Sequence, residues 1–224
     1  AQVSSHAGRD SKFAGIKLLT GTTDDDRTTI IPRSSGPELP AGFQSSAWAA
    51  VGFGSENKIE FSTALSTSGN IADAGIWAGL KLTSVGTYAT DASQAYFVYG
   101  ADDTLGAFTT NANLHFVYSI AGVDYITDLG IALTASTVYR LRIVFDENRQ
   151  ISVFVNNVQY GLTSATTAGG VTQTATKTKS LAMTNDIDFI PVVGVQTFTT
   201  SSKGIQCGYI KLSRDLYEVS GAGA

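Results

Sequence analysis

The sequence predicts an all-β protein, an antiparallel β-sandwich of the jelly-roll type with an extended N-terminal arm. Three observations favour this fold class: apolar and polar residues alternate in many short segments, turn-forming residues separate these segments, and no stretch has a convincing helical pattern. With 43% hydrophobic residues in a chain of 224, one large core is expected. Only 15% of the residues are charged, so we expect a neutral, hydroxyl-rich surface.

The clearest element is a β-hairpin predicted over residues 138–157. Its first strand places Tyr139 and Phe145 on one face and the two arginines Arg140 and Arg142 on the other. A polar turn follows, and the alternation resumes at residues 151–155. The pair Asn156-Asn157 then offers two residues that tolerate positive φ where the second strand must reverse.

Further strands are expected wherever the same alternation returns between turn signals. Their ranges in chain order are 58–65, 76–82, 95–99, 114–120, 137–145, 150–155, 188–196 and 205–214. Clusters of glycine, asparagine and aspartate, such as residues 68–70 and 100–103, mark the turns between them. Residues 163–179 contain few bulky apolar side chains, so we expect them to form a long surface loop.

The N-terminal part, residues 1–45, differs in texture from residues 46–224, which we expect to form the sandwich domain. It holds three of the four prolines, and because proline removes a ladder donor, this part is predicted to be an extended arm on the domain or on a neighbour. The anchors of this arm would be Phe13, Ile16, Leu18 and Leu19. The alternative, a strand and loop that close the protein's own sheet, is equally compatible with the sequence.

Composition and charge exclude several classes of partner. The net charge is −4 and the 15 lysines and arginines are scattered, so no nucleic-acid partner is expected. No stretch approaches the length of a membrane-spanning helix, so no membrane partner is expected either. The single Cys207 rules out an internal disulfide and is predicted to be a small buried apolar residue.

Catalytic patterns are weak, and the sequence predicts neither an enzyme nor a cofactor. Asp186 and Asp188 lack the following glutamate that a paired-carboxylate glycosidase strand would supply. His6 and His115 lie outside any Gln-x-His string that would provide a lyase base, although residues 209–212 superficially resemble a lyase tyrosine strand. The acidic runs 24–26 and 102–103 lack the spacing of a known calcium loop, so no metal site is predicted.

A sugar ligand would need aromatic platforms beside hydrogen-bonding side chains on one face of a sheet. Trp77 and Lys81 share one strand face, and Gln94 and Tyr96 share another. These four residues are the candidate glycan contacts, although core packing explains such aromatic residues equally well.

Several strings taken together resemble a concanavalin A-like sandwich domain found in structural proteins of tailed bacteriophages. They are residues 74–83, 90–97 and 127–131, followed by the hairpin 139–157 and the strands 190–196 and 209–214. The resemblance covers about residues 70–214, and residues 1–45 match no family that we can name.

The resemblance implies a non-enzymatic component of a phage virion. Such a protein would sit on the virion surface as a capsid decoration, cement or head-fibre subunit, self-associate, and bind other capsid or fibre subunits. The alternative is a lectin-like adhesion module that binds a host glycan, because one fold serves both roles. A polysaccharide hydrolase or lyase is disfavoured by the weak catalytic patterns.

Overall fold

The computed structural model describes residues 8–9, 15–31, 55, 57–100, 108, 112–166 and 175–215. Within these ranges the chain is built from strands and loops, and none of its elements is a helix long and apolar enough to cross a membrane. The strands are β1 (Gly8–Arg9), β2 (Ile16–Leu19), β3 (Arg27–Ile30), β4 (Glu60–Thr67), β5 (Ala74–Lys81), β6 (Gln94–Gly100), β7 (Asn113–Ile120), β8 (Val123–Ala132), β9 (Val138–Phe145), β10 (Ile151–Val155), β11 (Val158–Tyr160), β12 (Ile190–Thr197) and β13 (Gly204–Ser213).

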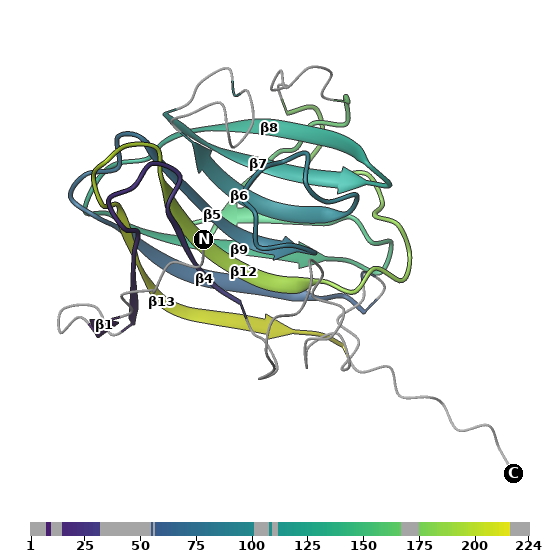
Figure 1. Ribbon diagram of the computed structural model, residues 1–224. Helices are drawn as coiled ribbons and strands as arrows, with labels where there is room; N and C mark the ends of the chain where they lie inside the picture. The colour runs from purple at the N-terminus through teal and green to yellow at the C-terminus, as the bar shows by residue number, and fades with distance from the viewer. Residues whose placement is uncertain are drawn as a thin grey trace, which may run out of the picture.

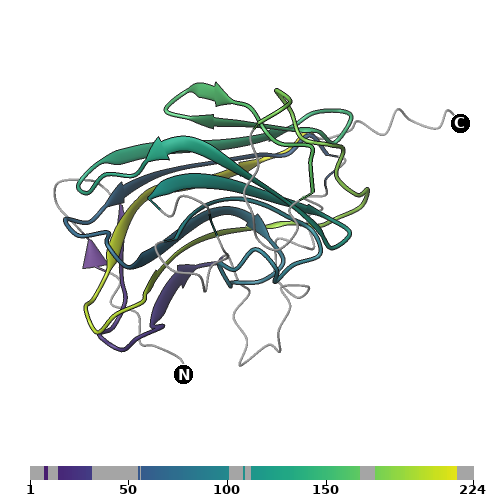
Figure 2. The same cartoon turned by 90° about the horizontal axis from the view of Figure 1, so that it is seen from above.

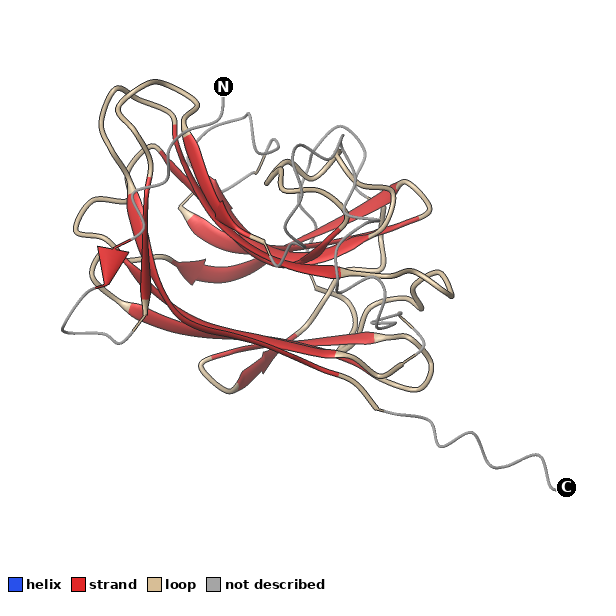
Figure 3. Ribbon diagram, turned by 60° about the horizontal axis from the view of Figure 1, so that its bottom comes forward, coloured by secondary structure: helices blue, strands red, loops and turns tan. Residues whose placement is uncertain are grey.

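The described strands form two antiparallel sheets that pack face to face (Figures 1 and 3). Sheet A has the order β1-β2-β13-β4-β9-β10-β11, and sheet B has the order β3-β12-β5-β6-β7-β8. Seen from above, both layers are curved (Figure 2). The prediction of an all-β antiparallel sandwich is therefore confirmed.

The two sheets differ in how far their outer faces are buried. In sheet A, β9 and β10 alternate buried and more exposed residues, as expected for a sheet with one open face. In sheet B, every residue of β5, β6 and β12 is buried, so these strands are covered on both faces. One apolar cluster fills the space between the sheets, and a second, around Trp77 and Tyr96, covers the outer face of sheet B.

The predicted hairpin is confirmed, with Val153 opposite Ile143 and Phe154 opposite Arg142. The reversal predicted at Asn156 and Asn157 is also confirmed, since their φ angles are +51° and +67°. After this turn the chain adds the short edge strand β11, which the sequence did not indicate because it has only three residues.

The N-terminal residues that the structure describes take the second of the two alternatives left open. Strand β2 pairs with β13 and strand β3 pairs with β12, so residues 16–19 and 27–30 extend the protein's own sheets. Leu18 is buried in the core, whereas Ile16 is 48% exposed. Phe13 lies outside the described residues, as do residues 32–54, so the predicted domain boundary at residue 45 stays a prediction.

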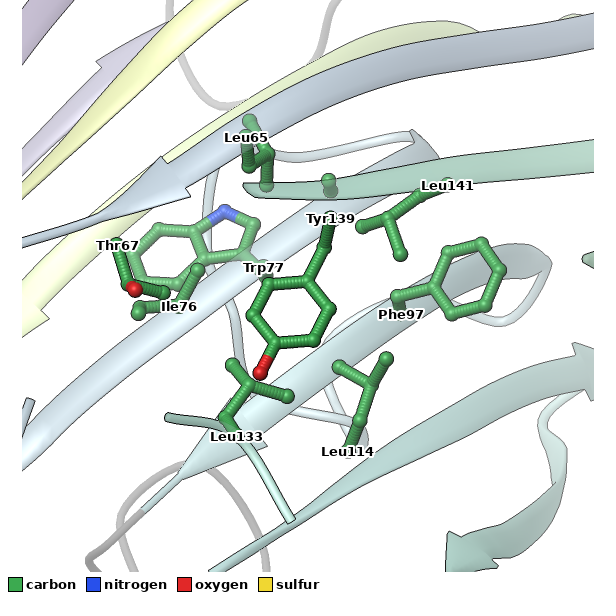
Figure 4. Close-up of a pocket in the computed structure, with 10 residues that line it drawn as sticks. Leu65, Thr67, Ile76, Trp77, Phe97, Leu114, Leu133, Tyr139 and Leu141 are labelled. Atoms are coloured by element: carbon green, nitrogen blue, oxygen red, sulfur yellow. The ribbon is translucent and has the colours of Figure 1, made fainter. Parts of the chain in front are cut away.

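A small apolar space lies in the core between the sheets, lined by Leu65, Ile76, Tyr139 and Leu141 among others (Figure 4). Its volume is about 20 Å³, which is little more than the room one water molecule needs. This space is therefore too small to hold a sugar.

Candidate functional site

The four predicted glycan contacts do come together in the structure. They lie on the outer face of sheet B, because Tyr96 pairs with Gly79, and Trp77, Gly79 and Lys81 share one face of β5. The Lys81 ammonium lies 4.1 Å from the centre of the Tyr96 ring and is hydrogen-bonded to the Gln94 side chain. Two sequence pairs thus become one cluster.

These four side chains are covered, however, with exposed fractions of 1% for Trp77 and 0% for the other three. The connection between β5 and β6 forms part of this cover, and Tyr96 and Gln94 are hydrogen-bonded to its backbone. The Tyr96 hydroxyl donates to the Gly86 carbonyl over 2.9 Å, and the Gln94 amide donates to the Tyr88 carbonyl. A sugar would reach them only after this connection had moved, so their role as glycan contacts stays a prediction.

Lys81 carries a charge into the interior, and its partners explain how that is tolerated. Its ammonium lies 3.4 Å from Asp91 Oδ2, and the same carboxylate oxygen accepts hydrogen bonds from the backbone of Leu82 and Thr83. Burial lowers the pKa of Lys81 to about 8, although the Asp91 carboxylate opposes that shift. The hydrogen bonds of this cluster therefore fix the β5–β6 connection, which is a structural role.

A second row on the same face contains two side chains, Trp77 and His115, whose ring nitrogens find no hydrogen-bond partner in the described part of the chain. Trp77, Val98 and His115 are consecutive cross-strand neighbours, and Asp128 follows on β8. Trp77 Nε1 and both ring nitrogens of His115 are buried and have no hydrogen-bond partner among the described residues. The ring of Phe108 stacks on His115 at 4.4 Å between centroids, and burial lowers the pKa of His115 although nearby Asp128 opposes this. His115 is therefore a buried side chain packed against an aromatic ring.

The outer face of sheet A is open and contains a groove. Its volume is about 320 Å³, within the range of small-ligand sites. The residues that line it come from β4, β9, β13 and the turn before β11, and they are Glu60, Ser62, Arg140, Leu141, Arg142, Asn157, Tyr209 and Lys211. None of them was a predicted site residue, although the alternation of Arg140 and Arg142 was recognised in the sequence.

Strand register explains why this surface is hollow. Ser62 on β4 lies between Lys211 and Arg142. Two residues further along the same face of this strand, Ala64 lies between Tyr209 and Arg140. A middle strand with small side chains thus runs between two strands with large ones. Because neighbouring strands lie about 4.8 Å apart, the two walls of the groove stand about 10 Å apart.

Tyr209 supplies the exposed aromatic ring of the groove, and a β-bulge places it there. The bulge lies between Cys207 and Tyr209, and the Thr63 hydroxyl donates to the Tyr209 carbonyl over 2.6 Å. Tyr209 itself is 46% exposed. Cys207, in contrast, is buried as predicted, and burial raises the pKa of its thiol.

The charged groups of the groove differ in how they are engaged. Arg142 Nη2 lies 3.2 Å from Glu60 Oε2, and the guanidinium lies 4.8 Å from the centre of the Phe154 ring. Arg140 and Lys211 have no ion-pair partner among the described residues. Within the same residues, no group of three or more histidine, cysteine, aspartate or glutamate side chains is close enough to hold a metal ion.

Comparison with known proteins gives the fold and leaves the family unassigned. No protein family matches the sequence, and no curated protein does. Among solved structures, an endo-β-1,4-glucuronan lyase from the fungus Trichoderma reesei is similar, with a TM-score of 0.55, 8% identity, and coverage of 95% of this chain and 88% of that one. The alginate lyase AlyC3 has a TM-score of 0.53, 8% identity, and coverage of 93% and 78%. The carbohydrate recognition domain of Emp47p has a TM-score of 0.52, 10% identity, and coverage of 96% and 88%.

The chain has an antiparallel jelly-roll sandwich fold, which these three structures share. The fold that the sequence resemblance implied is therefore confirmed. The virion location, the virion partners and the self-association that it also implied stay predictions. The prediction that the chain is not an enzyme was wrong, because it excluded enzymatic activity for a fold that two polysaccharide lyases share. At such low identity the likeness assigns no activity, so the enzymatic question is open.

Proposed function

We propose that this chain is a lectin-like carbohydrate-binding protein that takes its ligand in the groove on the outer face of sheet A. The observation that carries the proposal is the exposed ring of Tyr209 inside an open groove of about 320 Å³. The fold supports it, since the Emp47p domain of the same architecture is a carbohydrate recognition domain. A virion location and contact with other virion subunits stay separate predictions.

The groove offers both kinds of contact that a sugar uses. The apolar face of a pyranose ring can lie on the Tyr209 ring, which is rigid and presents a large surface. The Asn157 amide, the Ser62 hydroxyl and the arginine guanidinium groups can donate to or accept from sugar hydroxyls. The covered face of sheet B offers neither contact without moving the β5–β6 connection.

The test is carbohydrate binding by the full chain and by two variants of the groove. Tyr209→Ala removes the platform, and Ser62→Leu fills the floor between Lys211 and Arg142. Glycan-array screening followed by calorimetry should show a carbohydrate ligand whose affinity falls at least tenfold in both variants. Tyr209→Phe, which keeps the ring, should bind normally, and so should Val158→Ala, which alters an exposed apolar residue outside the groove.

The proposal fails if no carbohydrate binds, or if a sugar that does bind is held equally well by Tyr209→Ala and Ser62→Leu. The same incubations should be followed for shortening of the polysaccharide. Turnover that stops in the groove variants would place a cleaving activity at this site, and turnover that persists in them would place it elsewhere.

A further inference from the structure

The groove on sheet A is positively charged, although the whole chain has a net charge of −4. Three cationic side chains, Arg140, Arg142 and Lys211, line it, and among the described residues Glu60 is the only carboxylate that does so. A local excess of one charge sign in a chain of the opposite sign raises the local concentration of ligands that it attracts. The excess thus bears on which sugars the groove takes.

We infer that the groove selects acidic polysaccharides, whose sugar units carry a carboxylate, over neutral ones. This inference rests on the proposed carbohydrate binding and adds the chemical class of the ligand. Arg140 and Lys211, which have no ion-pair partner in the part of the chain that the structure describes, stand on opposite walls, on β9 and β13. A chain lying along β4 would therefore pass between two cations that are free to pair with its carboxylates.

A carboxylate is a better partner for Arg140 than a neutral hydroxyl is, because the planar guanidinium can bind both carboxylate oxygens at once. Its backbone is fixed, since the Arg140 amide donates to Asn156 Oδ1 over 2.9 Å. Lys211 adds a point charge from the other wall. Both side chains are exposed, so each is worth more to a ligand than to the stability of the fold.

Glu60 and Arg142 have a different role, because they are already paired. The Glu60 carboxylate lowers the positive potential of the groove and competes with any ligand carboxylate for Arg142. Removing this negative charge would therefore strengthen the binding of an acidic ligand. Removal of a charge near Tyr209 would leave the stacking of a neutral sugar on the ring unchanged. Charge and platform can thus be tested separately.

The experiment measures the affinity of the full chain for polygalacturonate and for a neutral β-glucan. Arg140→Gln and Lys211→Gln should each weaken polygalacturonate binding about 5- to 30-fold, which is the weak end of the range for a charge-assisted contact because both side chains are exposed to solvent. Glu60→Gln should strengthen it severalfold, and Lys177→Gln, which removes an exposed cation outside the groove, should leave it unchanged. Raising the ionic strength from about 0.05 M to about 0.5 M should weaken polygalacturonate binding and spare the glucan.

The inference is overturned if the two polymers bind equally and the charge variants change neither affinity, while Tyr209→Ala still abolishes binding. That result would leave carbohydrate binding intact and remove only the preference for acidic sugars. Polyglutamate serves as the second polyanion. If it binds as tightly as polygalacturonate, the groove recognises charge alone, and the assignment to acidic polysaccharides is refuted.

Discussion

Two single variants, Trp77→Ala and Tyr209→Ala, test whether the carbohydrate binds on the covered face of sheet B or on the open face of sheet A. Trp77 is 1% exposed, and truncation of a buried aromatic residue typically costs about 3–5 kcal/mol. Tyr209 is 46% exposed, so its truncation should cost less than about 1 kcal/mol. We expect Trp77→Ala to lose stability and Tyr209→Ala to lose carbohydrate binding.

Trp77→Phe refines this prediction. It removes part of the indole, but it also removes the buried Nε1 donor, which has no partner within the described ranges. Leaving a buried donor unsatisfied costs about 1–3 kcal/mol, which offsets much of the packing that phenylalanine forgoes. The free energy of unfolding of Trp77→Phe should therefore lie within about 1 kcal/mol of the parent value.

Urea titration followed by circular dichroism measures these differences. With an m-value of about 2–3 kcal/mol/M, a loss of about 4 kcal/mol lowers the midpoint by roughly 1.3–2 M. Binding is measured on the same samples under conditions in which each variant is folded. If Trp77→Ala unfolded at the parent midpoint and yet lost carbohydrate binding, sheet B would hold the accessible site and the present reasoning would be refuted.

Three further predictions concern the covered face. Because burial lowers the pKa of His115, the unfolded chain takes up the proton first as pH falls below about 6.5, so stability should fall toward pH 5; His115→Phe should flatten this dependence in urea titrations, and an identical slope would contradict it. The pKa of Lys81 is lowered to about 8, so the folded chain releases that proton before the unfolded chain does, and stability should rise between pH 8 and 10 by up to about 3 kcal/mol; in Lys81→Met the rise should disappear, and its persistence would assign it to another group. A Cβ on Gly194 would overlap the Trp77 indole, so Gly194→Ala should cost about 1–3 kcal/mol, whereas Gly69→Ala, where a Cβ would lie 3.9 Å from Ser136 Oγ at an ordinary contact distance, should be tolerated; equal midpoints for the two would show that the indole can move.

The long strands could be predicted from the sequence, and the short ones could not. In residues 139–145 each side chain indicates its face, because alternation with period two is decisive over seven or eight residues. Strands β2 and β3 have four residues each, and they are strands because β13 and β12 offer them an edge. Such pairing depends on distant residues, so composition alone could not decide between an extended arm and strands that close the protein's own sheets.

The candidate site could be predicted only in part, for the same reason. Trp77 and Lys81 were expected to share a face, and they do, but their burial depends on hydrogen bonds from Tyr96 and Gln94 to a polar connection. The groove needed knowledge of which strands are neighbours. The residues of both walls alternate visibly in the sequence, but β4 separates β9 from β13, and no local pattern shows that order.

The most direct test of the central claim is to map where a carbohydrate touches the protein. A chain of 23.5 kDa can be followed by NMR, so amide shifts can be recorded while galacturonate oligosaccharides are added to the full chain. We expect the largest shift changes on β4, β9 and β13, around Ser62, Arg140 and Tyr209. Changes centred on β5 and β6, around Trp77 and Tyr96, with none in the groove would contradict the account.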